Sequence, residues 1–223
     1  MKDIYRNKYS NKYNMDLEKN PRIKIMVKLI NELKLKNKNI LDIGCYDGTL
    51  LSQIKNNNLF GIEASDWAVQ KCQQKNINCQ KFYWNDHDKI PFQDNFFDVI
   101  IAGEIIEHIF DTDFFLEEIK RILKPNSPLF VSTPNIASLG RRLMLLFGLN
   151  PFIETSASQE NSGHIRYFTF KSLERLFKKH GLKIIKSKSD LINFSNNKNV
   201  NSKCLAKIFP ALGQSIIVLA RKK

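Results

Sequence analysis

Long apolar runs are missing from this chain of 223 residues, of which 26% are charged. No segment approaches the ~18–20 uncharged apolar residues that a membrane-spanning helix needs. The first residues, Met1 to Arg6, also lack the apolar stretch of a secretory signal. We therefore expect a cytoplasmic protein without a membrane span.

Cysteine is scarce, and its spacing is not that of a disulfide framework. The four cysteines are Cys45, Cys72, Cys79 and Cys204, and no two of them form a CxxC pair. Cys45 falls in a glycine-containing turn that a disulfide would distort. We expect free thiols in a reducing compartment and no zinc site.

Acidic residues are outnumbered by basic ones. The chain has 22 Asp and Glu and 35 Lys and Arg, which gives a formal net charge of +13. Such an excess is compatible with nucleic acid, an anionic membrane or a phosphorylated partner. The lysines are spread along the chain rather than clustered with aromatic residues, and Asn, Lys and Ile are all abundant. We favour a compositional bias over a nucleic-acid partner, and both interpretations stay open.

Short apolar runs alternate with amphipathic segments along most of the chain. Residues 1–20 read as a polar arm, and residues 21–223 as a single domain with one sizeable core. The alternation predicts a parallel sheet with right-handed crossovers and helices on both faces. The expected strands are 40–43, 59–63, 79–83, 97–102, 129–132, 182–187 and 215–220. The expected helices are 22–35, 49–56, one capped by Asp66, 112–123, 138–149 and one from Thr169 to His180, stopped by Gly181.

The segment 42–48, Asp-Ile-Gly-Cys-Tyr-Asp-Gly, gives the first chemical signal. A strand that leads into glycines and then a helix is the general plan of a nucleotide site. The dinucleotide fingerprint G-x-G-x-x-G fails here, because Tyr46 and Thr49 stand where it needs glycine. Asp42 and Asp47 would repel a pyrophosphate, whereas they suit a ligand with an ammonium and a sulfonium group. The turn therefore indicates S-adenosylmethionine rather than NAD.

Two further acids follow in step with the expected strands. Glu63 ends the next strand, where an acid can accept hydrogen bonds from both ribose hydroxyls. Asp86 follows the third strand within Trp84-Asn85-Asp86-His87, placed to meet the adenine amino group. A lone strand-end acid is usually only solvated. Three acids in order, one after each strand, favour a cofactor site.

Four short segments carry a family resemblance: residues 40–45 (Ile-Leu-Asp-Ile-Gly-Cys), 61–63 (Gly-Ile-Glu), 90–100 (beginning Ile-Pro-Phe and ending Phe-Asp-Val-Ile) and 123–125 (Leu-Lys-Pro). They resemble the class I S-adenosylmethionine-dependent methyltransferase superfamily, and its branch of ubiquinone-biosynthesis O-methyltransferases. The resemblance runs from about residue 39 to 134, with a weaker echo over 164–181. Tyr46 departs from the usual middle glycine of the loop.

The resemblance implies a Rossmann-like, doubly wound α/β fold. Its sheet would have seven strands, mostly parallel with the last strand antiparallel, and helices on both faces. The resemblance also implies cofactor contacts at Asp42, Gly44, Cys45, Gly48, Glu63, Asp86 and His87.

An acidic-histidine element, Gly103-Glu104-Ile105-Ile106-Glu107-His108, follows the fourth strand. If it is helical, its two glutamates and its histidine share one face. His108 is then a candidate general base for an acceptor hydroxyl. Together with a distant histidine, here His164, this element resembles a pattern found in the small-RNA 2′-O-methyltransferases and in some ubiquinone-pathway enzymes. By that resemblance, Glu104, Glu107, His108 and His164 would hold a divalent cation such as Mg²⁺, which binds vicinal hydroxyls of the acceptor. The alternative is that the glutamates line the pocket and His164 anchors its loop.

Residues 135–170 read as an acceptor-side helix and lid loop. The part 138–153 is strongly apolar and contains Arg141 and Arg142. We favour a packed roof over the acceptor pocket, with contact to an anionic membrane as the alternative. Arg166 is a candidate partner for an acidic acceptor, or for a structural ion pair.

The leading hypothesis is O-methylation of a small-molecule hydroxyl on a quinone precursor, a sugar or another metabolite. An RNA methyltransferase is a second hypothesis, although the Asn/Asp-Pro-Pro-Tyr element that methylates base amines is missing. A non-catalytic scaffold that keeps cofactor binding is a third. The sequence indicates neither the acceptor nor the oligomeric state.

Overall fold

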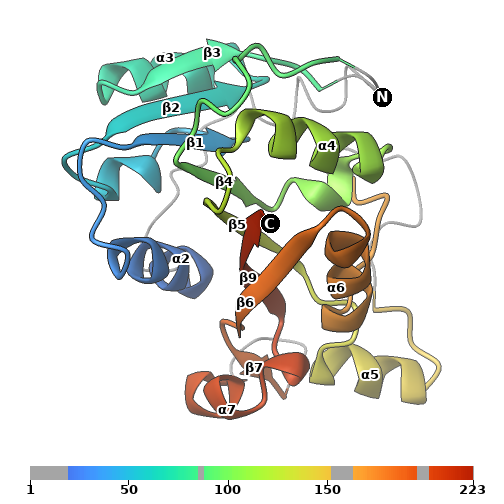
Figure 1. Ribbon diagram of the computed structural model, residues 1–223. Coiled ribbons are helices and arrows are strands. Elements are labelled where there is room, and N and C mark those ends of the chain that lie inside the picture. Colours follow the sequence, from blue (N-terminus) through green and yellow to red (C-terminus); the bar gives the residue numbers. More distant parts are fainter. Residues whose placement is uncertain (1–19, 85–87, 152–162, 195–200, 223) are drawn as a thin grey trace.

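The computed structural model describes residues 20–84, 88–151, 163–194 and 201–222 (Figure 1). Seven strands form one sheet in the order β3-β2-β1-β4-β5-β9-β6. The last strand, β9, pairs antiparallel with both β5 and β6, while the other neighbours pair in parallel. The predicted seven-stranded sheet with an antiparallel last strand is therefore confirmed.

The elements follow the predicted alternation. The strands of the sheet are β1 (Asn39–Ile43), β2 (Asn58–Glu63), β3 (Asn78–Lys81), β4 (Val99–Gly103), β5 (Pro128–Pro134), β6 (Leu182–Lys188) and β9 (Ser215–Lys222). The helices are α2 (Pro21–Asn31), α3 (Asp66–Gln74), α4 (Thr112–Ile122), α5 (Leu139–Leu146), α6 (Phe170–Lys179) and α7 (Lys203–Ile208). A short hairpin, β7 (Ile192–Asn193) with β8 (Asn201–Ser202), and the 3₁₀ turns η2 (Leu51–Gln53), η3 (Ile106–His108) and η4 (Pro210–Leu212) complete the described part.

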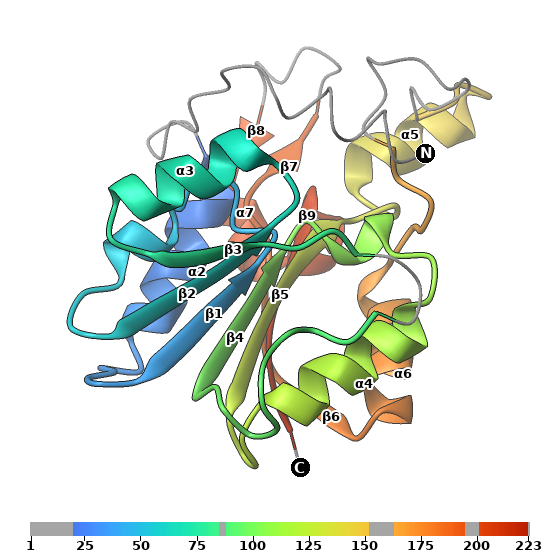
Figure 2. The same ribbon diagram turned by 90° about the horizontal axis from the view of Figure 1, so that it is seen from above.

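Helices cover both faces of the sheet, with α2 and α3 on one side and α4 and α6 on the other (Figure 2). Two apolar clusters correspond to these two faces. One joins α4 and α6 to alternate strand residues such as Leu41 and Ile100. The other joins α2 and α3 to the intervening residues such as Ile40 and Val99. Strands covered on both faces need continuous apolar runs, and that is the pattern seen in the sequence of β4.

Several predicted boundaries are wrong for local reasons. The helix predicted over 49–56 is only the 3₁₀ turn η2. Ser65, not Asp66, caps α3, because its side chain accepts from the Ala68 N–H. Helix α2 stops at Asn31 rather than residue 35. Both ends of α6 are as predicted. Thr169 and Ser172 form a capping box at its start, and Gly181 follows its end with a φ of +68°.

Some predictions fall outside the described residues: the polar arm up to residue 19, Asp86 and His87, and most of the lid loop (152–162). Among the described helices, none has the length and apolar character needed to cross a bilayer. The single-domain boundary and the cytoplasmic location stay predictions.

Candidate functional site

The carboxyl ends of β1, β2, β4 and β5 meet at one edge of the sheet, which is where parallel α/β sheets bind ligands. The turn after β1 begins at this edge. Gly44 and Gly48 both have a φ of +72°, a left-handed conformation that favours glycine. Tyr46 also lies in this region, with a φ of +48°. The turn therefore keeps the backbone shape of a glycine loop although one glycine is replaced by tyrosine.

Glu63, at the end of β2, closes this turn. One carboxylate oxygen, Oε2, accepts from the Tyr46 N–H at 2.9 Å. The other, Oε1, accepts from the N–H groups of Ala64 (2.7 Å) and Ser65 (3.1 Å). A carboxylate offers about four acceptor positions. Three are used here, so one acceptor position is left for a ribose hydroxyl, and the expected contact with both ribose hydroxyls stays a prediction.

Asp42 lies in β1 beside this loop, and only 5% of it is exposed. Burial raises the pKa of Asp42 well above its usual range, and the nearby charge of Glu63 raises it further, while Arg22 opposes the shift. Burial also raises the pKa of Glu63, against its three backbone hydrogen bonds. Two adjacent buried carboxyl groups repel anions and favour a cationic ligand. The residues present therefore fit S-adenosylmethionine.

Asp47 has a different role from the one expected. Its carboxylate accepts from the N–H and hydroxyl of Thr49, at 3.0 and 2.8 Å. It also forms an ion pair with Lys75 at 3.2 Å. Asp47 thus shapes the turn and its charge is balanced within the protein. The acidic character of the site comes from Asp42 and Glu63.

The side chain of Cys45 points away from the edge of the sheet and into the core, where it contacts Cys72 and Cys79. Any contact of Cys45 with the cofactor would therefore use its backbone. At Gly48, a Cβ would lie only 2.5 Å from Ile77 Cδ1, so this glycine is needed for packing as well as for its φ. The cofactor contacts themselves stay predictions.

Trp84, which directly precedes the residues that the structure leaves out, is a feature that the sequence did not single out. Its indole Nε1 is buried and has no hydrogen-bond partner among the described residues. Its ring packs edge-on against Phe115, with centroids 5.1 Å apart. A buried indole N–H usually has an acceptor, so this donor marks a place where a polar group can bind.

The acidic-histidine element is not an α-helix, so the condition for its side chains to share one helix face is not met. Glu104 has a φ of +56°, and only the single 3₁₀ turn η3 follows. The ligand atoms of Glu107, His108 and His164 nevertheless lie within 4.8 Å of one another. The backbone explains this, because the N–H groups of Ile165 and Arg166 both donate to the Glu107 carbonyl oxygen, at 2.9 and 3.0 Å. The loop is thereby fixed against η3.

Glu104 does not join this cluster. Its carboxylate lies 3.7 Å from the Arg22 guanidinium, which in turn donates to Ser132 Oγ at 3.0 Å. Its place in the predicted four-residue metal site therefore stays a prediction. Glu104 is still close enough for its charge to raise the pKa of Glu107.

Glu107 is the most unusual ionisable group at this edge. It is 1% exposed, and Oε2 accepts from Thr133 Oγ1 at 2.9 Å. Oε1 is buried without a hydrogen-bond partner among the described residues, 3.9 Å from His164 Nε2. Burial, followed by the charge of Glu104, raises the pKa of Glu107 well above its usual range. A buried carboxylate in this position requires a proton or a cation, and with two imidazoles beside it the residues fit a divalent ion.

The apolar segment after β5 does not form a packed roof within the described part of the chain. No residue of α5 is buried there, and Leu146 and Phe147 are each 75% exposed. Arg166, at the other end of the predicted lid, hydrogen-bonds to the carbonyl oxygens of Ile109 and Phe110. Arg166 therefore holds backbone, a role that differs from both the acceptor contact and the structural ion pair considered from the sequence.

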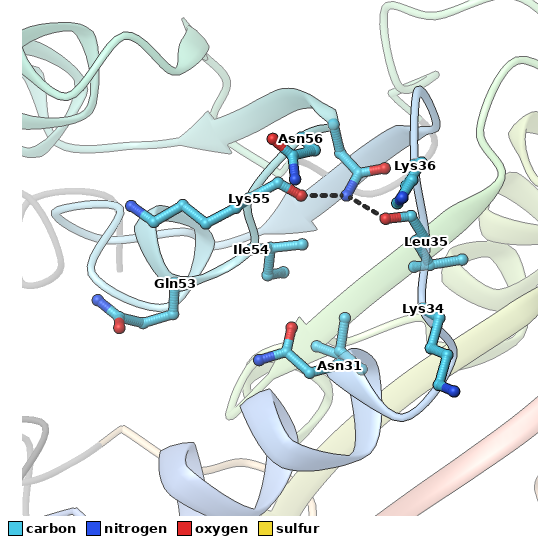
Figure 3. Close-up of a pocket in the computed structure, with 10 residues that line it drawn as sticks. Asn31, Lys34, Leu35, Lys36, Gln53, Ile54, Lys55 and Asn56 are labelled. Carbon is cyan, nitrogen blue, oxygen red and sulfur yellow. Dashed lines mark hydrogen bonds between the residues drawn. The ribbon is translucent and has the colours of Figure 1, made fainter.

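A pocket lies at the opposite edge of the sheet, between the end of α2 and η2 (Figure 3). It is lined by the segments 30–36 and 53–57, which precede β1 and β2. The Asn57 side chain donates to the carbonyl oxygens of Leu35 and Lys55, which links the two segments. Its position at the amino ends of the strands separates it from the acids described above.

Comparison with known families agrees with this geometry. The profile of the family described as a methyltransferase domain matches residues 18–187. The chain belongs to this family. The predicted resemblance to class I S-adenosylmethionine-dependent methyltransferases is thus confirmed.

Curated relatives match parts of this methyltransferase domain. A ubiquinone biosynthesis O-methyltransferase of Pelagibacter ubique is 35% identical over 113 residues, which cover 45% of the chain and 44% of that protein. A norajmaline N-methyltransferase of Rauvolfia serpentina is 33% identical over 107 residues, covering 43% of the chain and 36% of that protein. The chain thus matches less than half of the length of either relative.

Solved structures share the fold. A methyltransferase of Thermotoga maritima, described as a possible histamine N-methyltransferase, superposes with a TM-score of 0.62 at 18% identity, covering 90% of this chain and 89% of that one. The [4+2]-cyclase SpnF superposes with a TM-score of 0.62 at 15% identity, covering 99% and 92%. At these identities the likeness shows the fold and not the reaction.

Proposed function

We propose that this chain transfers the methyl group of S-adenosylmethionine to a hydroxyl of a small molecule, such as a quinone precursor, a sugar or another metabolite. The name of the Pelagibacter relative supports an oxygen acceptor. The name of the Rauvolfia relative shows that similar domains also serve nitrogen acceptors. The choice of oxygen therefore depends on the residues beside the donor site.

The observation that carries the proposal is the buried, unsatisfied Glu107 oxygen next to His108 and His164. The methyl sulfonium is already activated, so transfer depends mainly on alignment and desolvation. A hydroxyl acceptor must also lose its proton, whereas a neutral amine can attack as it is. A cluster that can remove or stabilise that proton is therefore what an O-methyltransferase needs here.

The two sides of the site would have separate roles. Asp42 and Glu63 would hold the cationic, ribose-bearing donor. Glu107, His108 and His164 would hold a divalent cation, which when bound lowers the pKa of an acceptor hydroxyl. Without a cation, His108 would accept the hydroxyl proton itself. Both versions place proton removal at the same three residues.

The test is a labelling assay with S-adenosylmethionine that carries a labelled methyl group and a pool of extracted metabolites. It is run with and without a chelator, on the wild type, His108→Ala and the matched surface variant Glu174→Ala. We expect labelled product from the wild type and Glu174→Ala, and loss of label in His108→Ala. Loss on chelation supports the cation, and chelator-insensitive labelling leaves His108 as the base.

The same assay separates the other hypotheses. Label in added RNA, lost as salt rises, would replace the small-molecule acceptor by nucleic acid. Donor binding without any labelled product would make the chain a non-catalytic scaffold.

We further propose that α5 and the residues after it make a peripheral contact with an anionic membrane. The exposed side chains of Leu145, Leu146 and Phe147 are adjacent to the basic Arg142. An apolar face with arginines beside it is typical of helices that lie in the lipid interface. Vesicle flotation with anionic and neutral lipid tests this contact.

A further inference from the structure

Three cysteines that are far apart in the sequence converge below the cofactor turn. Cys45 comes from the turn after β1, Cys72 from α3 and Cys79 from β3. The Sγ atom of Cys45 lies 3.6 Å from that of Cys72 and 3.5 Å from that of Cys79. All three sulfur atoms lie within 4.8 Å of one another, and all three residues are buried. The spacing in the sequence did not indicate this cluster.

Two glycines make room for the sulfur atoms. A Cβ at Gly61 would lie 2.5 Å from Cys45 Sγ and 3.2 Å from Cys79 Sγ. A Cβ at Gly48 would lie 3.1 Å from Cys72 Sγ. Gly61 lies in β2, between β1, which leads into the turn of Cys45, and β3, which carries Cys79. Because Gly61 has no side chain, the two cysteine side chains can meet across β2. The packing around the cluster is thus fitted to sulfur.

A fourth donor atom faces the same cluster. The carbonyl oxygen of Tyr46 lies 3.0 Å from Cys72 Sγ and 3.9 Å from Cys45 Sγ. The N–H of the same residue donates to Glu63. Tyr46 therefore joins the thiol cluster to the donor-binding turn through its backbone.

We propose that Cys45, Cys72 and Cys79 bind one zinc ion, with the Tyr46 carbonyl oxygen as the fourth ligand. Zinc prefers four ligands at tetrahedral positions, and Zn–S bonds of about 2.3 Å place neighbouring sulfur atoms about 3.8 Å apart. The observed separations of 3.5 and 3.6 Å are close to this value. On binding, the three thiols release their protons to solvent and each sulfur donates an electron pair to the ion. The ion fastens the cofactor turn to α3 and β3.

The nearby acids support a cation at this position. The hydrogen bonds with Cys72 and Cys79, and then burial, raise the pKa of the Cys45 thiol well above its usual range, and the charge of Asp42 adds to this. Three thiolates so close to Asp42 need a compensating positive charge, and zinc supplies it.

The test uses Co²⁺ as the probe, because it occupies zinc sites and gives a thiolate-to-metal absorption band only when cysteine ligates it. Reduced wild-type protein is unfolded and refolded with Co²⁺, and Cys72→Ser, Cys79→Ser and the exposed Cys204→Ser are treated alike. We expect one Co²⁺ per chain with the thiolate band in the wild type and Cys204→Ser, and loss of the band in the other two. The Glu107–His108–His164 cluster can bind Co²⁺ but cannot produce this band, so the two sites are distinguished.

A second measurement covers variants that fold poorly because serine is buried in the core. Zinc at about 100-fold above its Kd is expected to raise the Tm of the reduced wild type by roughly 5–10 °C. The shift is also measured in the His108→Ala background, which removes a ligand of the second divalent-ion cluster. There it should vanish when Cys72→Ala is added, since that variant keeps an apolar side chain, and persist when Cys204→Ser is added. The proposal is overturned if the wild type shows neither the band nor the shift, or if either persists in the Cys72 variants.

Discussion

The proposed donor and acceptor sides of this site are built in different ways. On the donor side, the Glu63 carboxylate accepts hydrogen bonds from the N–H groups of Ala64 and Ser65, which follow it in the chain, and of Tyr46 in the turn after β1. On the acceptor side, Glu107 and His164 come from segments far apart in the chain and meet through backbone hydrogen bonds from the loop to η3. The donor side is therefore local in sequence, whereas the acceptor side depends on how distant segments pack.

The two sides also differ in how their buried charge is satisfied. Glu63 accepts three backbone hydrogen bonds, which offset the cost of its burial. Glu107 accepts one from Thr133 and leaves its second oxygen without a hydrogen-bond partner among the described residues. A buried polar group without a partner costs roughly 1–3 kcal/mol. We infer that the donor side is preorganised and that the acceptor side is completed by what binds there.

The largest expected effect tests the acceptor side alone. His108→Ala should lower kcat by about 100- to 10,000-fold, because a positioned general base contributes that range. The Kd for S-adenosylmethionine should stay within a factor of about 2, since His108 is not part of the donor turn. Single-turnover labelling measures the first and calorimetry the second. Equal losses in both would remove the separation between the two sides.

A second prediction tests the packing under the donor side. Gly61→Val should destabilise the protein by about 1–3 kcal/mol, because its Cβ would overlap Cys45 Sγ. Gly140→Ala is the control, since among the described residues its Cβ meets only Asn193 O, at 3.5 Å, and alanine favours the helix. Urea unfolding measures both. An unchanged midpoint for Gly61→Val would contradict the tight packing.

A third prediction uses the raised pKa of Glu107. The folded protein binds this proton more tightly than the unfolded chain, so stability is lost as pH rises through the folded-state pKa. Glu107→Gln, with chelator present, should be more stable than the wild type at about pH 8, by about 1 kcal/mol or more, since one pKa unit corresponds to about 1.4 kcal/mol. The difference should shrink below about pH 4.5, near the unfolded pKa.

Glu174→Gln is the matched control, because Glu174 is exposed on α6. It should show no pH-dependent difference from the wild type in the same unfolding experiment. A Glu107→Gln protein that is less stable than the wild type at high pH would mean that the carboxylate is well satisfied in the folded state.

The smallest effect on stability is expected on the surface of α5. The double substitution of Leu146→Ser and Phe147→Ser should change the free energy of unfolding by no more than about 0.5 kcal/mol, because both side chains are largely exposed. Binding to anionic vesicles should fall at least severalfold in a flotation assay. A marked loss of stability without a change in flotation would favour a packed role for this helix.

The same contrast explains what the sequence could predict. Asp42 and Glu63 could be placed because each follows from a strand and the turn after it. Glu107, His108 and His164 lie close together although the element is not an α-helix, since η3 and the loop pair through backbone. The separation of Glu104 from these three residues had no signal in the sequence, because its positive φ depends on tertiary structure.

Other features depend on three-dimensional packing and had no signal in the sequence. The sequence suggests that Asp47 is a second acid facing the ligand, whereas in the structure it forms an ion pair with Lys75, at the end of α3. Cys45 and Cys79 meet only because Gly61 lies between them in the sheet. The exposed face of α5 could not be separated from a packed roof, since both have the same apolar composition.

Calorimetric titration of S-adenosylmethionine into three proteins tests the central claim most directly. Glu63→Ala should weaken binding by about 10- to 100-fold, because it removes a charged acceptor worth roughly 1.5–3 kcal/mol. The wild type and Glu107→Gln should bind alike, since Glu107 belongs to the acceptor side. Equal binding by wild type and Glu63→Ala, or NAD binding where S-adenosylmethionine does not bind, would contradict the account.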